Sequence, residues 1–151
     1  MSDITTVILA AGNSTRFKAS KSKLVYPLCG LPIVSHIFNI AKKISGKNIL
    51  VVSNEKNKEE LKLILNTSKL VVQKKQKGTA DAIEQVKKYV KSKNILILFG
   101  DTPLVEVKDI RKLVSKFKKS KAKASLIAFN TSEPHGYCLL YTSPSPRDPS
   151  I

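Results

Sequence analysis

Two kinds of apolar pattern alternate along the chain. Short, nearly continuous apolar runs predict buried strands, and the stretches between them repeat apolar residues every three or four positions, which predicts helices with one buried face. The predicted strands are Ile4–Ala10, Asn48–Ser53, Lys69–Gln73, Asn94–Gly100 and Ala122–Asn130. The predicted helices are Leu31–Ser45, Lys56–Asn66, Thr79–Lys91 and Glu106–Ser120. Strands and helices therefore take turns as far as residue 130.

Strands and helices that alternate at this spacing predict an α/β fold. The expected architecture is Rossmann-like: a doubly wound, mostly parallel sheet with helices on both faces. Asn94–Gly100 is the most continuous of the apolar runs. Because it is apolar on both faces, it predicts a strand in the middle of the sheet. Thr79 is predicted to cap the N-terminus of the third helix.

The pattern changes after Tyr137. Residues 1–137 are predicted to form the N-terminal part of the domain, which would be incomplete at its C-terminus. Residues 138–151, "CLLYTSPSPRDPSI", are rich in proline and serine and have no period. They are expected to form a disordered, non-native tail, because they resemble translated sequencing-adapter read-through.

The composition is that of a soluble globular protein, with 42% hydrophobic and 25% charged residues. No apolar run approaches the ~20 residues that span a bilayer. The first residues also lack the basic-then-apolar order of a signal peptide. We therefore expect a cytoplasmic protein with no membrane partner.

The formal net charge of +16 has two interpretations. The lysines form a solvated surface, or they serve an anionic partner such as a phosphate-bearing small molecule or a nucleic acid. Nucleic acid is the less favoured partner, because aromatic residues are sparse and only three of the 27 basic residues are arginine. One of these, Arg16, has the forked guanidinium that binds phosphate through two hydrogen bonds.

Candidate chemistry follows the strands, because ligands of open parallel sheets bind beyond the carboxyl ends of the strands. The turn after the first strand, "LAAGNSTR", has small residues that let backbone N–H groups approach phosphates. Arg16 and Lys23 can neutralise their charge. The turn is neither a GxGxxG fingerprint nor a Walker A box, so a tight strand exit with solvated lysines is the alternative.

Two further turns are predicted at the same edge. Gln73 and Gln76 offer donors and acceptors to the edge of a base, and Gly78-Thr79 opens a helix that can bind an anion or a sugar hydroxyl. Most other carboxylates lie on predicted helices or at the opposite edge of the sheet, which leaves Asp101 as the candidate metal ligand. Its hard oxygen atoms are the kind of ligand that Mg²⁺ prefers. The alternatives are a polar loop with a capping threonine and a turn-forming aspartate.

The segments LAAGNSTRF, QKKQKGTADA, LFGDTPL and PHGY occur in the order and spacing of the sugar-1-phosphate nucleotidyltransferases. From Ile4 to Tyr137 the chain resembles this family. Within the family it is most similar to the uridylyltransferase domain of bifunctional enzymes that also have a glucosamine-1-phosphate acetyltransferase domain. The resemblance implies a fold of the nucleotide-diphospho-sugar transferase type.

By position, the resemblance also implies the site residues. Those implied to bind the nucleotide are Leu9, Ala10, Ala11, Gly12, Lys23, Gln73, Gln76, Gly78, Thr79, Phe99 and Gly100. Arg16 and Lys23 would be catalytic, Asp101 would hold Mg²⁺, and Gly136 would contact the sugar. The departures from the family pattern are Ser14 for glycine, Ser22 for proline, Phe99 for tyrosine and Cys138-Leu139-Leu140 for Gly-Arg-Ile.

The implied reaction transfers a uridylyl group from UTP to N-acetylglucosamine 1-phosphate. Its products are pyrophosphate and UDP-N-acetylglucosamine, a precursor of the peptidoglycan cell wall. UTP and a sugar 1-phosphate would be the partners, and the parent protein would form a homo-oligomer through a C-terminal domain. This fragment is expected to be inactive. The rivals are a transferase of the same family that uses GTP or dTTP, and a lysine-rich nucleic-acid-binding module.

Overall fold

The structure, a computed structural model, describes residues 3–13, 17, 21–66, 69–75 and 77–133. The chain divides into two compact units, with the boundary between Arg111 and Lys112. The predicted tail, residues 138–151, lies outside the described residues. None of the helices in the described ranges is long and apolar enough to cross a membrane.

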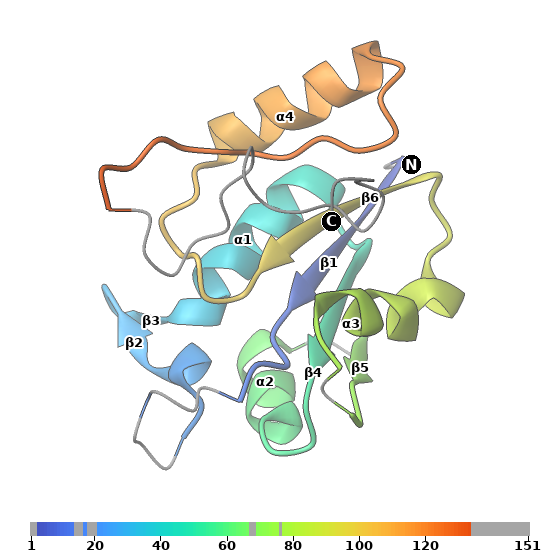
Figure 1. The fold of residues 1–151 in the computed structure, drawn as a ribbon. Coiled ribbons are helices and arrows are strands. Elements are labelled where there is room, and N and C mark those ends of the chain that lie inside the picture. Colours follow the sequence, from blue (N-terminus) through green and yellow to red (C-terminus); the bar gives the residue numbers. More distant parts are fainter. Residues whose placement is uncertain (1–2, 14–16, 18–20, 67–68, 76, 134–151) are drawn as a thin grey trace, which may run out of the picture. The chain divides into compact units, whose positions relative to one another are not determined.

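The first unit is built on a parallel sheet of four strands (Figure 1). They are β1 (Ile4–Leu9), β4 (Ile49–Ser53), β5 (Leu70–Val72) and β6 (Asn94–Phe99), in the spatial order β5-β4-β1-β6. In the register of the sheet, Val7 pairs with Leu50 of β4 and with Ile97 of β6. The chain thus winds from β1 outwards to β5 and then crosses back to β6, which confirms the predicted doubly wound sheet.

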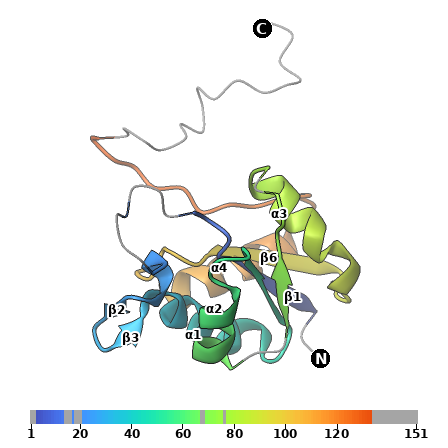
Figure 2. The same ribbon diagram turned by 90° about the horizontal axis from the view of Figure 1, so that it is seen from below.

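Helices cover both faces of this sheet, as predicted. Figure 2 shows α1 (Ile33–Ser45) and α2 (Lys58–Leu65) on one side and α3 (Thr79–Val86) on the other. The remaining elements of the unit are η1 (Lys23–Val25), the hairpin of β2 (Pro27–Leu28) and β3 (Leu31–Pro32), η2 (Lys87–Tyr89) and the start of α4 (Val107–Lys119). The hairpin was not predicted.

The side chains of β1 alternate between two buried layers, because successive residues of a strand point to opposite faces. On one face, Thr6 accepts a hydrogen bond from the hydroxyl of Ser45 in α1, with 2.8 Å between the oxygens. On the other face, Val7 belongs to a buried cluster with Leu50 and with Val86 of α3. The sheet is therefore held from both sides, and its strand ends are fixed relative to one another.

The predicted position of β6 is wrong, because β6 lies at an edge of the described sheet. Leu96 and Leu98 are buried, whereas Ile95 and Ile97 are 42% and 36% exposed. The exposed pair lies on the face of the sheet that α3 covers, and α3 packs mainly on β1, β4 and β5. A continuous apolar run does not distinguish a strand covered on both faces from a strand covered on one.

The predicted fifth strand, Ala122–Asn130, is also wrong. In the second unit these described residues form no strand, and Leu126 and Phe129 are 62% and 65% exposed. Strand formation depends on pairing and packing with a neighbouring strand as much as on the residue pattern. The apolar pattern alone therefore overpredicts the sheet here.

Candidate active site

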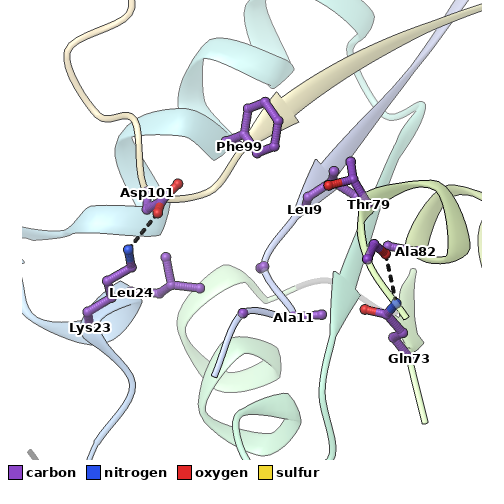
Figure 3. A pocket seen from close by; sticks show the side chains of 12 residues that line it. Leu9, Ala11, Lys23, Leu24, Gln73, Thr79, Ala82, Phe99 and Asp101 are labelled. Carbon is purple, nitrogen blue, oxygen red and sulfur yellow. Dashed lines mark hydrogen bonds and ion pairs between the residues drawn. The ribbon is translucent and has the colours of Figure 1, made fainter. Parts of the chain in front are cut away.

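A cavity lies at the carboxyl edge of the sheet, where β1 and β6 end side by side (Figure 3). The N–H of Gly100 donates a hydrogen bond of 2.9 Å to the carbonyl of Leu9 and joins the two strand ends. The winding of the chain reverses between these two strands. The cavity has a volume of about 300 Å³, at the lower end of the range for small-molecule sites. It lies where doubly wound sheets bind their ligands.

The structure brings ten of the predicted site residues together around this cavity. They come from segments far apart in the sequence: Leu9, Ala10, Ala11, Gly12, Lys23, Gln73, Gly78, Thr79, Phe99 and Asp101. Gly100 lies directly beside it, through its hydrogen bond to Leu9. Three predicted residues, Arg16, Gln76 and Gly136, are outside the described residues. The grouping is thus observed, and the individual roles stay predictions.

Two buried asparagines hold the turn that follows β1. Asn57 Nδ2 donates to the carbonyl of Ala10 at 2.8 Å, and Asn54 Nδ2 donates to the carbonyl of Ala11 at 3.0 Å. The asparagines also lock each other, since the side-chain oxygen of each accepts a hydrogen bond from the main-chain N–H of the other. In a trans peptide the carbonyl and the following N–H point in opposite directions. Fixing these carbonyls therefore turns the N–H groups of Ala11 and Gly12 away from the asparagines.

Lys23 and Asp101 form an ion pair at the cavity, with 2.5 Å between Nζ and Oδ2. Their side chains are 37% and 40% exposed. A pair this exposed contributes at most about 1 kcal/mol, so a phosphate or a cation can compete for either partner. Asp101 is the only carboxylate among the described residues that line the cavity. The pair therefore offers one cationic and one anionic ligand to a charged molecule.

The predicted capping role of Thr79 is wrong, because Thr79 is the first residue of α3 and Gly78 occupies the cap position. Gly78 has φ of +99°, a backbone conformation that residues with a Cβ rarely adopt. The carbonyl of Gly78 accepts a hydrogen bond of 3.2 Å from Nε2 of Gln73. The turn after β5 and the start of α3 are thereby joined at the cavity (Figure 3).

The family of the chain follows from comparison with known proteins. The family model of the MobA-like NTP transferase domain matches residues 6–148. The chain belongs to this family. The predicted resemblance to nucleotidyltransferases is thereby confirmed.

Curated relatives of this NTP transferase domain are bifunctional GlmU proteins. The chain is 41% identical over 137 residues to Bifunctional protein GlmU of Buchnera aphidicola subsp. Schizaphis graminum, covering 89% of this chain and 29% of that protein. It is 30% identical over 133 residues to Bifunctional protein GlmU of Bacillus subtilis, covering 87% of this chain and 29% of that protein. The chain thus spans less than a third of the length of these relatives.

Solved structures share the fold of the NTP transferase domain. A putative glucose-1-phosphate thymidylyltransferase from Bacillus anthracis matches 78% of this chain and 51% of its own, with a TM-score of 0.70 and 21% identity. A CMP:2-keto-3-deoxy-manno-octonic acid synthetase in complex with CTP matches 79% of this chain and 48% of its own, with a TM-score of 0.63 and 18% identity. At this level of identity the matches establish the fold.

Four residues of the cavity and its supporting turn were not predicted. Leu24 and Ala82 line the cavity, and Asn54 and Asn57 hold the turn after β1. The asparagines had a signal in the sequence, because "SNEKN" puts two of them at the carboxyl end of a predicted strand, where asparagine often bonds to backbone groups. No comparable signal marks Leu24 or Ala82, which are apolar residues in apolar patterns.

Any side chain at position 100 is expected to lower the stability of the protein. A Cβ at this position would lie 3.2 Å from the backbone oxygen of Leu9 and 3.5 Å from the Cβ of Ala10. Gly100→Ala should therefore push the ends of β1 and β6 apart and lower the free energy of unfolding by about 1 kcal/mol. Urea denaturation followed by circular dichroism measures this change.

Gly12→Ala is the matched control for this prediction. A Cβ at Gly12 would meet no atom within 4 Å. The control should unfold at nearly the wild-type urea concentration. Equal destabilisation of the two variants would contradict the close approach as the cause.

Proposed function

We propose that the chain is the nucleotide-binding part of a uridylyltransferase that transfers the uridylyl group of UTP to N-acetylglucosamine 1-phosphate. The products are UDP-N-acetylglucosamine and pyrophosphate. The observation that supports this most is the grouping of residues from the turns after β1, β5 and β6 around one cavity. The choice of UTP and of the amino-sugar phosphate rests on the resemblance of the sequence motifs to uridylyltransferase domains, and the match to the MobA-like NTP transferase domain supports nucleotidyl transfer. Because the chain spans less than a third of its GlmU relatives, the activity is proposed for the whole protein.

The proposed reaction needs no nucleophile from the protein. A phosphate oxygen of the sugar phosphate attacks the α-phosphorus of UTP, the bond from that phosphorus to the bridging oxygen of the β-phosphate breaks, and pyrophosphate leaves. The obstacle is the approach of two anions, since two unit charges ~4 Å apart repel by about 4 kcal/mol at the effective dielectric of a protein surface. The protein has to hold both anions and neutralise part of their charge.

The residues of the cavity meet these demands in different ways. The turn after β1 has small side chains at Ala10, Ala11 and Gly12, so the backbone can lie close to the triphosphate. Lys23 neutralises phosphate charge once it leaves Asp101. The resemblance assigns the same task to Arg16. Gln73 and the start of α3 lie at the other side of the cavity, where the base is expected (Figure 3).

Asp101 fits the predicted role of a Mg²⁺ ligand. Mg²⁺ in nucleotide sites is typically held by one or two carboxylates together with substrate phosphates and water. Within the described ranges, no group of three or more His, Cys, Asp or Glu side chains comes together, and a shared site of this kind needs none. When bound, Mg²⁺ supplies positive charge to the phosphate oxygens of UTP and of the leaving pyrophosphate.

Calorimetric titration of the chain with UTP, GTP, dTTP and CTP in the presence of Mg²⁺ tests the proposal. We expect one UTP per chain and weaker binding of the other nucleotides. Preference for GTP or dTTP would reject uridylyl transfer in favour of another member of the family. Binding of no nucleotide would reject the nucleotide site itself.

The nucleic-acid alternative has a separate test. A lysine-rich binding module should retain labelled DNA or RNA on a filter at low salt and release it steeply as salt rises. We expect neither duplex nor single strands to compete with UTP for the cavity. Competition at stoichiometric concentrations would favour the nucleic-acid function.

A further inference from the structure

The side chain of Gln73 is held in one orientation by two neighbours. Gln73 is 4% exposed, and its main-chain N–H donates to the carbonyl of Ser53 at 2.8 Å. Its side-chain Nε2 donates to the carbonyl of Gly78 at 3.2 Å and to Oδ2 of Asp81 at 2.6 Å. A carbonyl and a carboxylate accept hydrogen bonds and donate none. Both hydrogens of the Gln73 amide are therefore used on this side.

The opposite orientation of the amide is excluded by the same neighbours. Turning the group by half a turn would point Oε1 at two acceptors, one of which is a carboxylate, and would leave both part-buried acceptors without the amide donor. Asp81 contributes most to fixing the orientation of the Gln73 amide, because a hydrogen bond to a carboxylate is stronger than one to a neutral carbonyl. Asp81 is itself fixed on α3, where its Oδ1 also accepts from Nε2 of Gln85 at 3.4 Å.

Oε1 of Gln73 consequently faces the cavity as an acceptor. Gln73 lines the cavity, and Figure 3 shows its oxygen directed away from the dashed bond, on the side of Ala11. Among the described residues, none donates a hydrogen bond to this oxygen. A ligand that fills this part of the cavity must therefore present an N–H or O–H to Gln73.

We propose that Asp81 is a specificity-determining residue that fixes Gln73 as an acceptor, so that the site selects a base with an imino N–H. This inference rests on the proposed function, in which the base is uracil. The N3–H of uracil can donate to Oε1, whereas N3 of cytosine is itself an acceptor and would oppose it. Asp81 positions Gln73 and does not touch the base.

Asp81→Ala tests this assignment through the ratio of the dissociation constants for CTP and UTP. Without Asp81, the amide of Gln73 can turn and offer Nε2 to N3 of cytosine. We expect UTP to bind more weakly and CTP to bind more tightly, so that the preference for UTP falls about tenfold, the equivalent of one hydrogen bond. A gain in CTP affinity is a result that simple damage to the fold cannot produce.

Two further variants complete the experiment, which is run by calorimetry on the whole chain with Mg²⁺. Asp81→Asn keeps the volume and can either accept from or donate to Gln73, so the preference for UTP should fall here too. Glu84→Ala removes the same charge from the exposed side of α3 and should leave the preference unchanged. An unchanged preference in both Asp81 variants, or an equal fall in Glu84→Ala, overturns the inference. Failure of the wild-type chain to prefer UTP over CTP overturns the uridylyl assignment instead.

Discussion

Asp101→Asn is expected to remove most of the dependence of UTP binding on Mg²⁺. A neutral amide is a much poorer ligand than a carboxylate for this hard cation. The increase in UTP affinity that Mg²⁺ brings should shrink roughly 100-fold, or by about 2.7 kcal/mol. The measurement is a pair of UTP titrations by calorimetry, one with Mg²⁺ and one with EDTA.

The same substitution should strengthen metal-free binding of UTP. In the structure Asp101 holds Lys23 in an ion pair, and its negative charge opposes an incoming triphosphate. Replacing the carboxylate frees Lys23 for phosphate and removes the repulsion, so we expect a roughly tenfold gain in affinity in EDTA. Loss of a metal ligand should weaken the response to Mg²⁺ and strengthen metal-free binding of UTP. General damage to the site should weaken UTP binding under both conditions.

Glu106→Gln is the matched control, because Glu106 is an exposed carboxylate of the same unit that pairs with Lys108 and does not line the cavity. It should change neither titration. An Asp101 variant that keeps its full response to Mg²⁺ would show that another group holds the cation.

The sequence predicted the grouping of most of the candidate site residues, because strand ends can be read from apolar patterns. Gly12 and Asp101 each follow a predicted strand, and Gln73 is the last residue of one. Once the strands are parallel, all three turns must lie at one edge of the sheet. The structure places these residues around one cavity. Predicting that the turns lie together requires only the direction of the strands. It requires no knowledge of side-chain contacts.

The order of strands and the contacts between turns could not be predicted in the same way. The position of β6 at an edge depends on which elements cover it, and its apolar sequence is compatible with either position. The bonds from Asn54 and Asn57 to the turn after β1 join residues more than 40 positions apart. They depend on the register between β1 and β4, which period-two alternation alone leaves open.

Asn57→Asp is expected to lower the free energy of unfolding by about 3 kcal/mol. The carboxylate would replace the Nδ2 donor to the carbonyl of Ala10 by an oxygen that repels it, in a position that is 2% exposed. An aspartate just before α2 would ordinarily stabilise the helix through its dipole. A loss of stability would therefore identify the bond to Ala10 as the deciding contact. Urea denaturation measures it, and UTP affinity should fall in parallel because the turn after β1 loosens.

Asn39→Asp provides the matched control for the change of amide to carboxylate. Asn39 is exposed on α1, where surface substitutions usually alter stability by no more than ~0.5 kcal/mol. If Asn57→Asp proved as stable as this control, the dipole of α2 would outweigh the bond to Ala10. The conformation of the turn after β1 would then be determined by the residues of the turn itself. If only Asn57→Asp lost both stability and UTP affinity, the phosphate-side backbone of the site would be set by a residue that need not touch the nucleotide.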